Sequence, residues 1–177
     1  FKKYIADMFK LYGFSAEQAE EKAQAVFQHE TMLALISKSA TELRNPQANY
    51  NKMTLKEFQS SYPNLHLEEM CNAEGIKSEF IQDMIVGQPA FMEGLDKITA
   101  AESAATLKAL MEWDVITSSA AYLTDEIREC NFDFFGKTMS GRKEDYPLWK
   151  RAVNQVQSQM GEPLGRMYCK RYFPESS

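Results

Sequence analysis

The chain holds two histidines, His29 and His66, and the first of them has a neighbour that suggests metal chemistry. His29 is followed by Glu30, as in the His-Glu-x-x-His helix, where two imidazoles one turn apart bind zinc and the Glu acts as general base. In this chain the fifth position is Leu33, so the second imidazole is missing. Because a single imidazole does not hold zinc, we expect His29 and Glu30 to be helix residues with local hydrogen bonds.

Enzymes with a zinc-binding helix often take a third ligand from a Glu-x-x-x-Asp pair. That spacing occurs twice here, at Glu79 and Asp83 and again at Glu129 and Asp133. The same spacing occurs twice in a chain that lacks the second histidine, so it is not specific for a metal site. We expect these four carboxylates to lie on helix surfaces. We therefore assign no catalytic and no metal-binding residue in this chain, and its substrate-binding residues stay unassigned.

The sequence has no arrangement typical of nucleophilic catalysis, since a Gly-x-Ser-x-Gly elbow is missing. Cys71, Cys130 and Cys169 lie far apart, with no Cys-x-x-Cys pair among them. An odd number excludes complete intramolecular pairing, so we expect three reduced, buried thiols. Gly161 and Gly165 lack the preceding strand and the Gly-Lys-Ser/Thr of a phosphate-binding loop.

Basic and aromatic residues gather between positions 134 and 151. A nucleic-acid site combines positive charge with stacking side chains in this way. Glu144 and Asp145 dilute the charge, however, and the aromatic residues fall at the spacing of a helical core. We favour packing over nucleic-acid binding for these residues: Lys137, Arg142, Lys143, Lys150 and Arg151, with Phe134, Phe135, Tyr146 and Trp149.

The composition is that of an acidic globular chain, large enough for one domain or for part of a larger one. Its 177 residues are 44% hydrophobic and 25% charged, with a formal net charge of −5. The acidic balance argues against nucleic acid, because phosphate binding needs clustered Lys and Arg. No apolar run approaches the roughly 20 residues that span a bilayer, and no signal peptide is visible. The chain starts at Phe1 within a helical pattern, which we interpret as a piece of a larger protein.

Apolar residues spaced by three and four predict a mainly α fold with long helices and at most one short strand or hairpin. Ser15 and Gln18 match a capping box, and Gly13 suits the end of the preceding helix. The one good strand candidate is 84–86. Loops are expected at 44–51 and 140–143. The expected helices cover 3–11, 15–36, 54–62, 67–75, a segment from Pro89, 103–127 and 149–172.

Several motifs follow one another along most of the chain. They read LRNP and NYNKMT at 43–54, VGQPAF at 86–91, NFDFFGKTMSG at 131–141, PLWKRAV at 147–153 and GEPLGRMY at 161–168. In this order they resemble the neprilysin family of zinc metallopeptidases, which includes the endothelin-converting enzymes. Asn45, Leu148 and Pro163 depart from the family, which often has Asp, Arg and Ala there.

The resemblance implies that residues 1–177 are part of the N-terminal, lid-type helical domain of a larger peptidase. Family members are several times longer, and they bind zinc through two His and a Glu, with another Glu as general base. Those residues lie beyond the part that this chain resembles. The catalytic zinc domain is therefore expected to be absent, and no family site residue maps onto this chain.

The resemblance further implies a zinc-dependent metalloendopeptidase that hydrolyses small peptides, with this chain inactive by itself. Zinc is expected only in the full-length protein. The expected partners are the C-terminal catalytic lobe of the same polypeptide and peptide substrates, without nucleic acid and without a membrane-spanning segment in this chain. Family members suggest a periplasmic, envelope-anchored or secreted bacterial protein, and a cytoplasmic location stays open.

The alternative is a stand-alone helical protein-interaction module. A weaker alternative is a helical nucleic-acid binder that uses residues 137–151.

Overall fold

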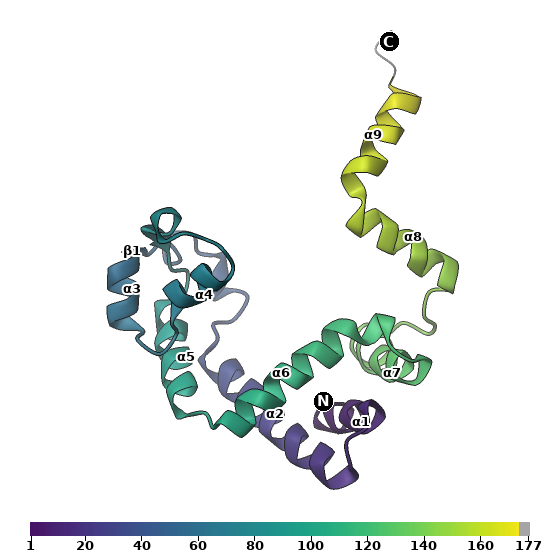
Figure 1. Ribbon diagram of the computed structural model, residues 1–177, viewed down its shortest axis with the longest axis horizontal. Coiled ribbons are helices and arrows are strands. Elements are labelled where there is room, and N and C mark those ends of the chain that lie inside the picture. Colours follow the sequence, from purple (N-terminus) through teal and green to yellow (C-terminus); the bar gives the residue numbers. More distant parts are fainter. Residues whose placement is uncertain (174–177) are drawn as a thin grey trace. The chain divides into compact units, whose positions relative to one another are not determined.

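The computed structural model describes residues 1–173 and confirms the mainly α class. The chain divides into two compact units, Phe1–Cys130 and Asn131–Ser177. The first unit combines helices with a small sheet (Figure 1). Its elements are α1 (Lys2–Tyr12), α2 (Ala16–Ile36), β1 (Lys52–Thr54), α3 (Leu55–Ser61), α4 (Leu67–Ala73), β2 (Asp83–Ile85), α5 (Pro89–Ala101) and α6 (Ala104–Ser119). The next helix, α7 (Asp125–Asn131), ends at the boundary between the two units.

Local sequence signals set the ends of the first helices. Gly13 ends α1 in the left-handed conformation with φ 115°, which favours glycine. The Ser15 hydroxyl then accepts a hydrogen bond from the Gln18 N–H at 3.2 Å, and the Gln18 side chain accepts from the Ser15 N–H at 3.1 Å. This confirms the expected capping box, and the short turn lets α2 pack beside α1 (Figure 1).

A second capping box starts α3. Thr54 donates from its backbone N–H and its hydroxyl to Glu57 Oε2, each at 2.8 Å. These two hydrogen bonds stabilise the carboxylate and hold the pKa of Glu57 below its usual value. The N-cap at Thr54 fixes the place where the chain leaves β1 and turns into a helix.

The main core of the first unit lies where α1, α2 and α6 pack together. Its largest fully buried side chains are Ile5, Met8, Phe9, Val26 and Ile116. The Trp113 ring meets the Tyr4 ring edge-on at 5.4 Å between centroids. Burial here raises the pKa of the Tyr4 hydroxyl. Each fully buried aliphatic or Phe side chain contributes about 1.5–3 kcal/mol, so this cluster holds the three helices together.

A smaller core lies against the two-stranded sheet. Strands β1 and β2 pair antiparallel, with Met53 opposite Met84. Phe58, Tyr62 and Val86 are buried beside them. The expected strand at 84–86 lies one residue earlier than predicted, and the sequence reading missed its partner β1.

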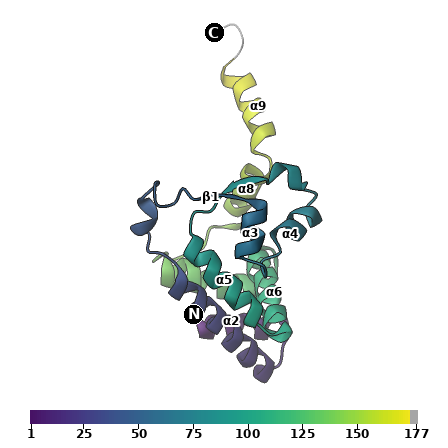
Figure 2. The ribbon, with the colours of Figure 1, turned by 90° about the vertical axis from the view of Figure 1, so that its left-hand side faces the viewer.

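The buried carboxylate of Asp96 links α5 to the turn after α3. Its two oxygens accept from the backbone N–H of Asn64 at 2.7 Å and from Asn64 Nδ2 at 2.9 Å. Asp96 is only 8% exposed, and its hydrogen bonds to Asn64 offset the cost of burying a charge. Figure 2 shows α3, α4 and α5 gathered in this part of the unit.

The expected continuous helix over 103–127 is wrong in its middle. Helix α6 ends at Ser119, a 3₁₀ turn follows at Ala120–Tyr122, and α7 begins at Asp125. Near this end the Thr117 hydroxyl donates to the Trp113 carbonyl at 2.8 Å. Hydroxyls that bond back to the preceding turn bend and weaken a helix, although the apolar spacing continues through the break.

The second unit starts with a π-helical segment, Phe132–Met139, and continues with α8 (Leu148–Gln159) and α9 (Gly161–Tyr172). The loop expected at 140–143 is confirmed, with Gly141 at φ 66°. One expected helix over 149–172 is wrong, because Met160 leaves helical geometry at φ −125° and ψ 30° (Figure 1). Gly136 leaves room for the Phe132 ring, since a Cβ there would lie 2.2 Å from it.

Replacing Gly94 with alanine is expected to destabilise the contact between α2 and α5. A Cβ at Gly94 would lie 2.8 Å from Ile36 Cδ1 and 3.3 Å from Ile36 Cβ. Overpacking of this kind costs about 1–3 kcal/mol, which exceeds the gain of about 1 kcal/mol in helix propensity. Urea unfolding should therefore show a net loss. In an Ile36→Ala background the same change should become stabilising, and a loss of equal size in both backgrounds would contradict this packing.

Candidate functional site

His29 is bonded across the fold and not to its sequence neighbour. Its Nδ1 lies 2.9 Å from Glu102 Oε1, and the two side chains are only 14% and 11% exposed. Glu102 is the C-cap of α5, so this contact ties α2 to the corner between α5 and α6. The expectation of a local partner is therefore wrong. The role of His29 seen here is structural.

The other candidate residues for chemistry are engaged in separate surface pairs. His66 precedes α4, with its Nδ1 3.2 Å from Glu69. Among residues 1–173, no three His, Cys, Asp or Glu side chains come together as a metal site would require. That this chain supplies no catalytic or metal-binding residue stays a prediction. The expectation of helix-surface carboxylates is wrong for Asp83, which lies in β2 opposite Thr54. The carboxylates of both Glu-x-x-x-Asp pairs lie near cations, in the pairs Lys77–Glu79, Lys52–Asp83, Arg128–Glu129 and Lys137–Asp133.

Cys71 and Cys169 are free thiols. Cys71 and Cys130 are half-buried, and Cys169 is exposed. The expectation of three buried thiols is therefore wrong. The physical reason for two of them is that Cys71 and Cys169 lie on α4 and α9, two helices that bury no residue in this structure.

The basic and aromatic cluster forms local cation–π contacts. The Arg142 guanidinium and the Lys150 ammonium each lie 4.3 Å from the centroid of the Tyr146 ring. Phe135, Tyr146 and Trp149 are 46%, 42% and 67% exposed, so the expectation that they fill a core is wrong for these three. Trp149 lies on α8, but Tyr146 lies in the loop before it and Phe135 in the π-helical segment, so the three do not share one helix.

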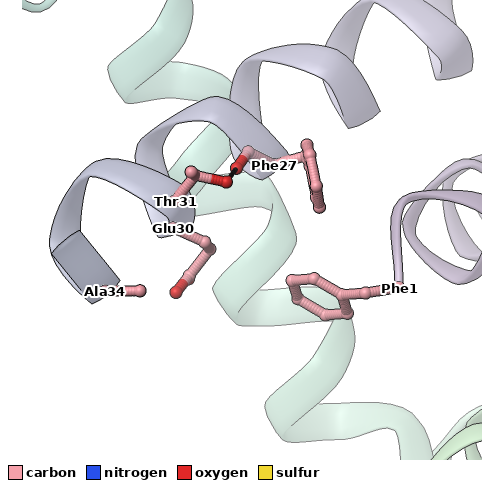
Figure 3. Close-up of a pocket in the computed structure, with 5 residues that line it drawn as sticks. All are labelled: Phe1, Phe27, Glu30, Thr31 and Ala34. Atoms are coloured by element: carbon pink, nitrogen blue, oxygen red, sulfur yellow. Dashed lines mark hydrogen bonds between the residues drawn. The ribbon is translucent and has the colours of Figure 1, made fainter.

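A shallow hollow of about 340 Å³ lies beside α2 (Figure 3). Its lining consists of Phe1, Phe27, Glu30, Thr31 and Ala34. The Thr31 hydroxyl is occupied by a hydrogen bond of 2.7 Å to the Phe27 carbonyl. Glu30 thus supplies a single carboxylate at an otherwise apolar recess, which suits binding of an apolar group but holds no nucleophile–base pair.

An uncovered apolar surface of the second unit runs along α8 and α9. We define the α8–α9 apolar face by side chains three or four residues apart that are 43% to 67% exposed. Such spacing places them on one side of each helix. Soluble proteins rarely leave so many large apolar side chains in contact with water unless another surface binds there. The face consists of Trp149, Val153, Val156, Met160, Leu164, Tyr168 and Tyr172.

Within the part of the chain that the structure describes, no helix combines the length and apolar character needed to cross a lipid bilayer.

Comparison with known proteins gives a consistent result. The sequence model of peptidase family M13 matches residues 1–177. Neprilysin-2 of Drosophila melanogaster is 26% identical over 99% of this chain, and neutral endopeptidase of Lactobacillus helveticus is 25% identical over 99%. Human endothelin-converting enzyme 1 is 23% identical over 98%. The chain covers 24%, 27% and 23% of these relatives, about a quarter of their length.

The fold agrees with that of a solved enzyme. The Mycobacterium tuberculosis zinc metalloprotease Zmp1 in its open state matches 98% of this chain with a TM-score of 0.93 and 26% identity. Zmp1 in complex with an inhibitor matches 99% with a TM-score of 0.92. In both cases the match covers 27% of the Zmp1 chain. On the match over its full length and on this fold, the chain belongs to peptidase family M13 and corresponds to an N-terminal region of these zinc metallopeptidases.

Proposed function

We propose that this chain is part of the N-terminal lid lobe of a zinc-dependent metalloendopeptidase that hydrolyses small peptides. The observation that carries the proposal is the family match over residues 1–177. In this proposal the chain helps to enclose the substrate, and the chemistry is done by a catalytic lobe elsewhere in the same polypeptide. The relatives leave room for such a lobe, because this chain matches only about a quarter of their length.

The residues described here do not fit a zinc site. His29 is committed to Glu102, His66 lies on the surface beside Glu69, and no group of three ligands forms among residues 1–173. In the proposed enzyme the zinc ligands and the general base therefore come from outside this chain. This chain contributes walls that exclude water and limit the size of what enters.

A lid function is supported by the described helices and by Zmp1, which has been solved both open and with an inhibitor bound. The first unit has a packed helical core and its own ion pairs, which suits a body that moves as one piece. A wall of this kind selects by size. Peptides and unfolded segments pass into the cavity, and folded proteins stay outside.

The test uses the longer protein that carries this chain. It should cleave a fluorogenic peptide, lose that activity when a chelator removes zinc, and leave a folded protein with the same cleavable sequence intact. This chain alone should cleave neither substrate. Peptide cleavage by this chain alone, or equal cleavage of the peptide and the folded protein, would overturn the proposal.

The proposed location is the periplasm, the cell envelope or the exterior of a bacterium, and it rests on the family resemblance. Fractionation of the source cells checks it, with a cytoplasmic location as the alternative. A stand-alone interaction module would instead bind a separate protein and would have no peptidase activity in its longer form.

A further inference from the structure

Helix α8 exposes its apolar side to water and partly buries its basic side, which is the reverse of a typical surface helix. A surface helix normally buries its apolar side and leaves its charged side in water. In α8 the basic residues Lys150 and Arg151 are half-buried, while Trp149, Val153 and Val156 are exposed. Lys150 lies against the Tyr146 ring of the same unit. The side of α8 that faces its own unit is thus polar, and its apolar side has nothing against it among the described residues of that unit.

Helix α9 also exposes large apolar side chains, together with its basic residues, and it has space for a close neighbour. Leu164, Tyr168 and Tyr172 lie on one side of it and are 43%, 56% and 59% exposed. Gly161 and Gly165 lie on that side too, and a Cβ at either position would meet nothing within 4 Å. Gly165 lies in the interior of α9, where glycine weakens a helix, and no described residue of its unit uses the space it leaves. An element packed closely on this side would use that space.

Helices α8 and α9 carry a net positive charge, which disfavours a second copy of the chain as the surface that covers them. Residues 148–173 contain five Lys or Arg and one Glu, within a chain whose net charge is −5. Two copies meeting face to face would bring two basic segments together. A surface with an apolar centre and an acidic rim complements this segment better.

The length of the relatives points to the source of that surface. Zmp1 contains the counterparts of nearly all residues of this chain, yet the match covers only 27% of Zmp1. The remaining part of such a polypeptide is tethered to this chain and therefore present at high effective concentration. An anionic membrane fits less well, because the basic side of α8 is half-buried and cannot face lipid headgroups freely.

We propose that the α8–α9 apolar face is the surface on which a later segment of the same family M13 polypeptide packs, with an apolar centre and an acidic rim. This inference rests on the proposed function and names the internal partner of the lid lobe. The Trp149 and Val156 side chains form the anchor on α8, and the Gly165 notch receives the closest approach on α9.

Cys169 provides a probe at the edge of this face, because it is exposed on α9 next to Tyr168 and one turn after Gly165. Alkylation of each cysteine with iodoacetamide is followed by peptide mass spectrometry, in this chain alone and in the longer protein. Cys169 should react about 100-fold more slowly in the longer protein, because packing makes the thiol react only during local opening. The protection should not depend on protein concentration. Equal rates in the two proteins would overturn the inference.

A matched pair of variants in the longer protein tests which side of the helix is involved. Val156→Asp should raise the alkylation rate of Cys169 in the longer protein by at least about 10-fold, because it places a charge in the packed face. Ser158→Asp, on the opposite side of α8, should leave the protection unchanged. If Val156→Asp prevents folding, the wild-type comparison still decides, and protection that survives Val156→Asp in a folded protein would contradict the inference.

Other occupants and the proposed function give different results. Protection that grows with protein concentration would assign the face to a second copy. Binding of the longer protein to anionic vesicles with protection of Cys169 only there would assign it to a membrane. Either result would overturn the inference. Zinc-dependent peptide cleavage with an unprotected Cys169 would refute the inference alone, and protection without any cleavage would refute the proposed function alone.

Discussion

Replacing Phe9 with alanine should lower the free energy of unfolding of this chain by about 3–5 kcal/mol, the usual cost of deleting a buried aromatic ring. Phe9 is fully buried between α1, α2 and α6, with the Phe14 and Trp113 rings 5.6 Å and 5.9 Å from it. Three helices surround the site, so they cannot collapse easily into the cavity. Urea unfolding, followed by the fluorescence of Trp113 in a Trp149→Phe background, measures the change.

Leu11→Ala is the matched control for Phe9→Ala. Leu11 lies on the same helix but is 43% exposed, so its truncation should cost about 1 kcal/mol or less. Similar losses for the two variants would mean that α1 does not pack against α2 and α6 as described.

The second large effect is expected at Asp96. Asp96→Ala should lower the free energy of unfolding by about 2–3 kcal/mol, because it removes hydrogen bonds to a charged group and leaves the Asn64 N–H without its acceptor. Hydrogen exchange of the Asn64 amide should accelerate together with this loss.

Asp83→Ala is the control for charge alone. Asp83 pairs with Lys52 at 3.1 Å, but both side chains are about 60% exposed, at 62% and 60%. Such surface pairs contribute between 0 and about 1 kcal/mol. Equal losses for Asp83→Ala and Asp96→Ala would show that burial of the Asp96 carboxylate contributes nothing.

The parts of the fold that sequence predicted well depend on short-range signals. Gly13, Ser15 and Thr54 act within a few residues of their own position, and each ends or starts a helix where expected. The break after Ser119 escaped prediction because apolar residues continue at helical spacing through it. Strand β1 was not predicted because it has only three residues, too few to show the alternation of apolar and polar residues that is typical of a strand.

The contacts that matter for the candidate site are tertiary, and the sequence reading missed them. His29 and Glu102 are 73 positions apart and meet only because α2 and α5 pack together. The spacing of Trp149, Val153 and Val156 predicted an apolar face correctly, but not that the described residues of the second unit leave this face uncovered. The motif at 131–141 gains a physical reason from the structure, since the Phe132 ring occupies the space that Gly136 leaves open.

The zinc content of two purified proteins tests the central claim most directly. The longer protein that carries this chain should contain about one tightly bound zinc per polypeptide, as a catalytic site with three protein ligands does. This chain alone, dialysed in the same buffer, should contain none above the background of the buffer. Stoichiometric zinc in this chain alone, or none in an active longer protein, would contradict the assignment of this chain to the lid lobe of a zinc metallopeptidase.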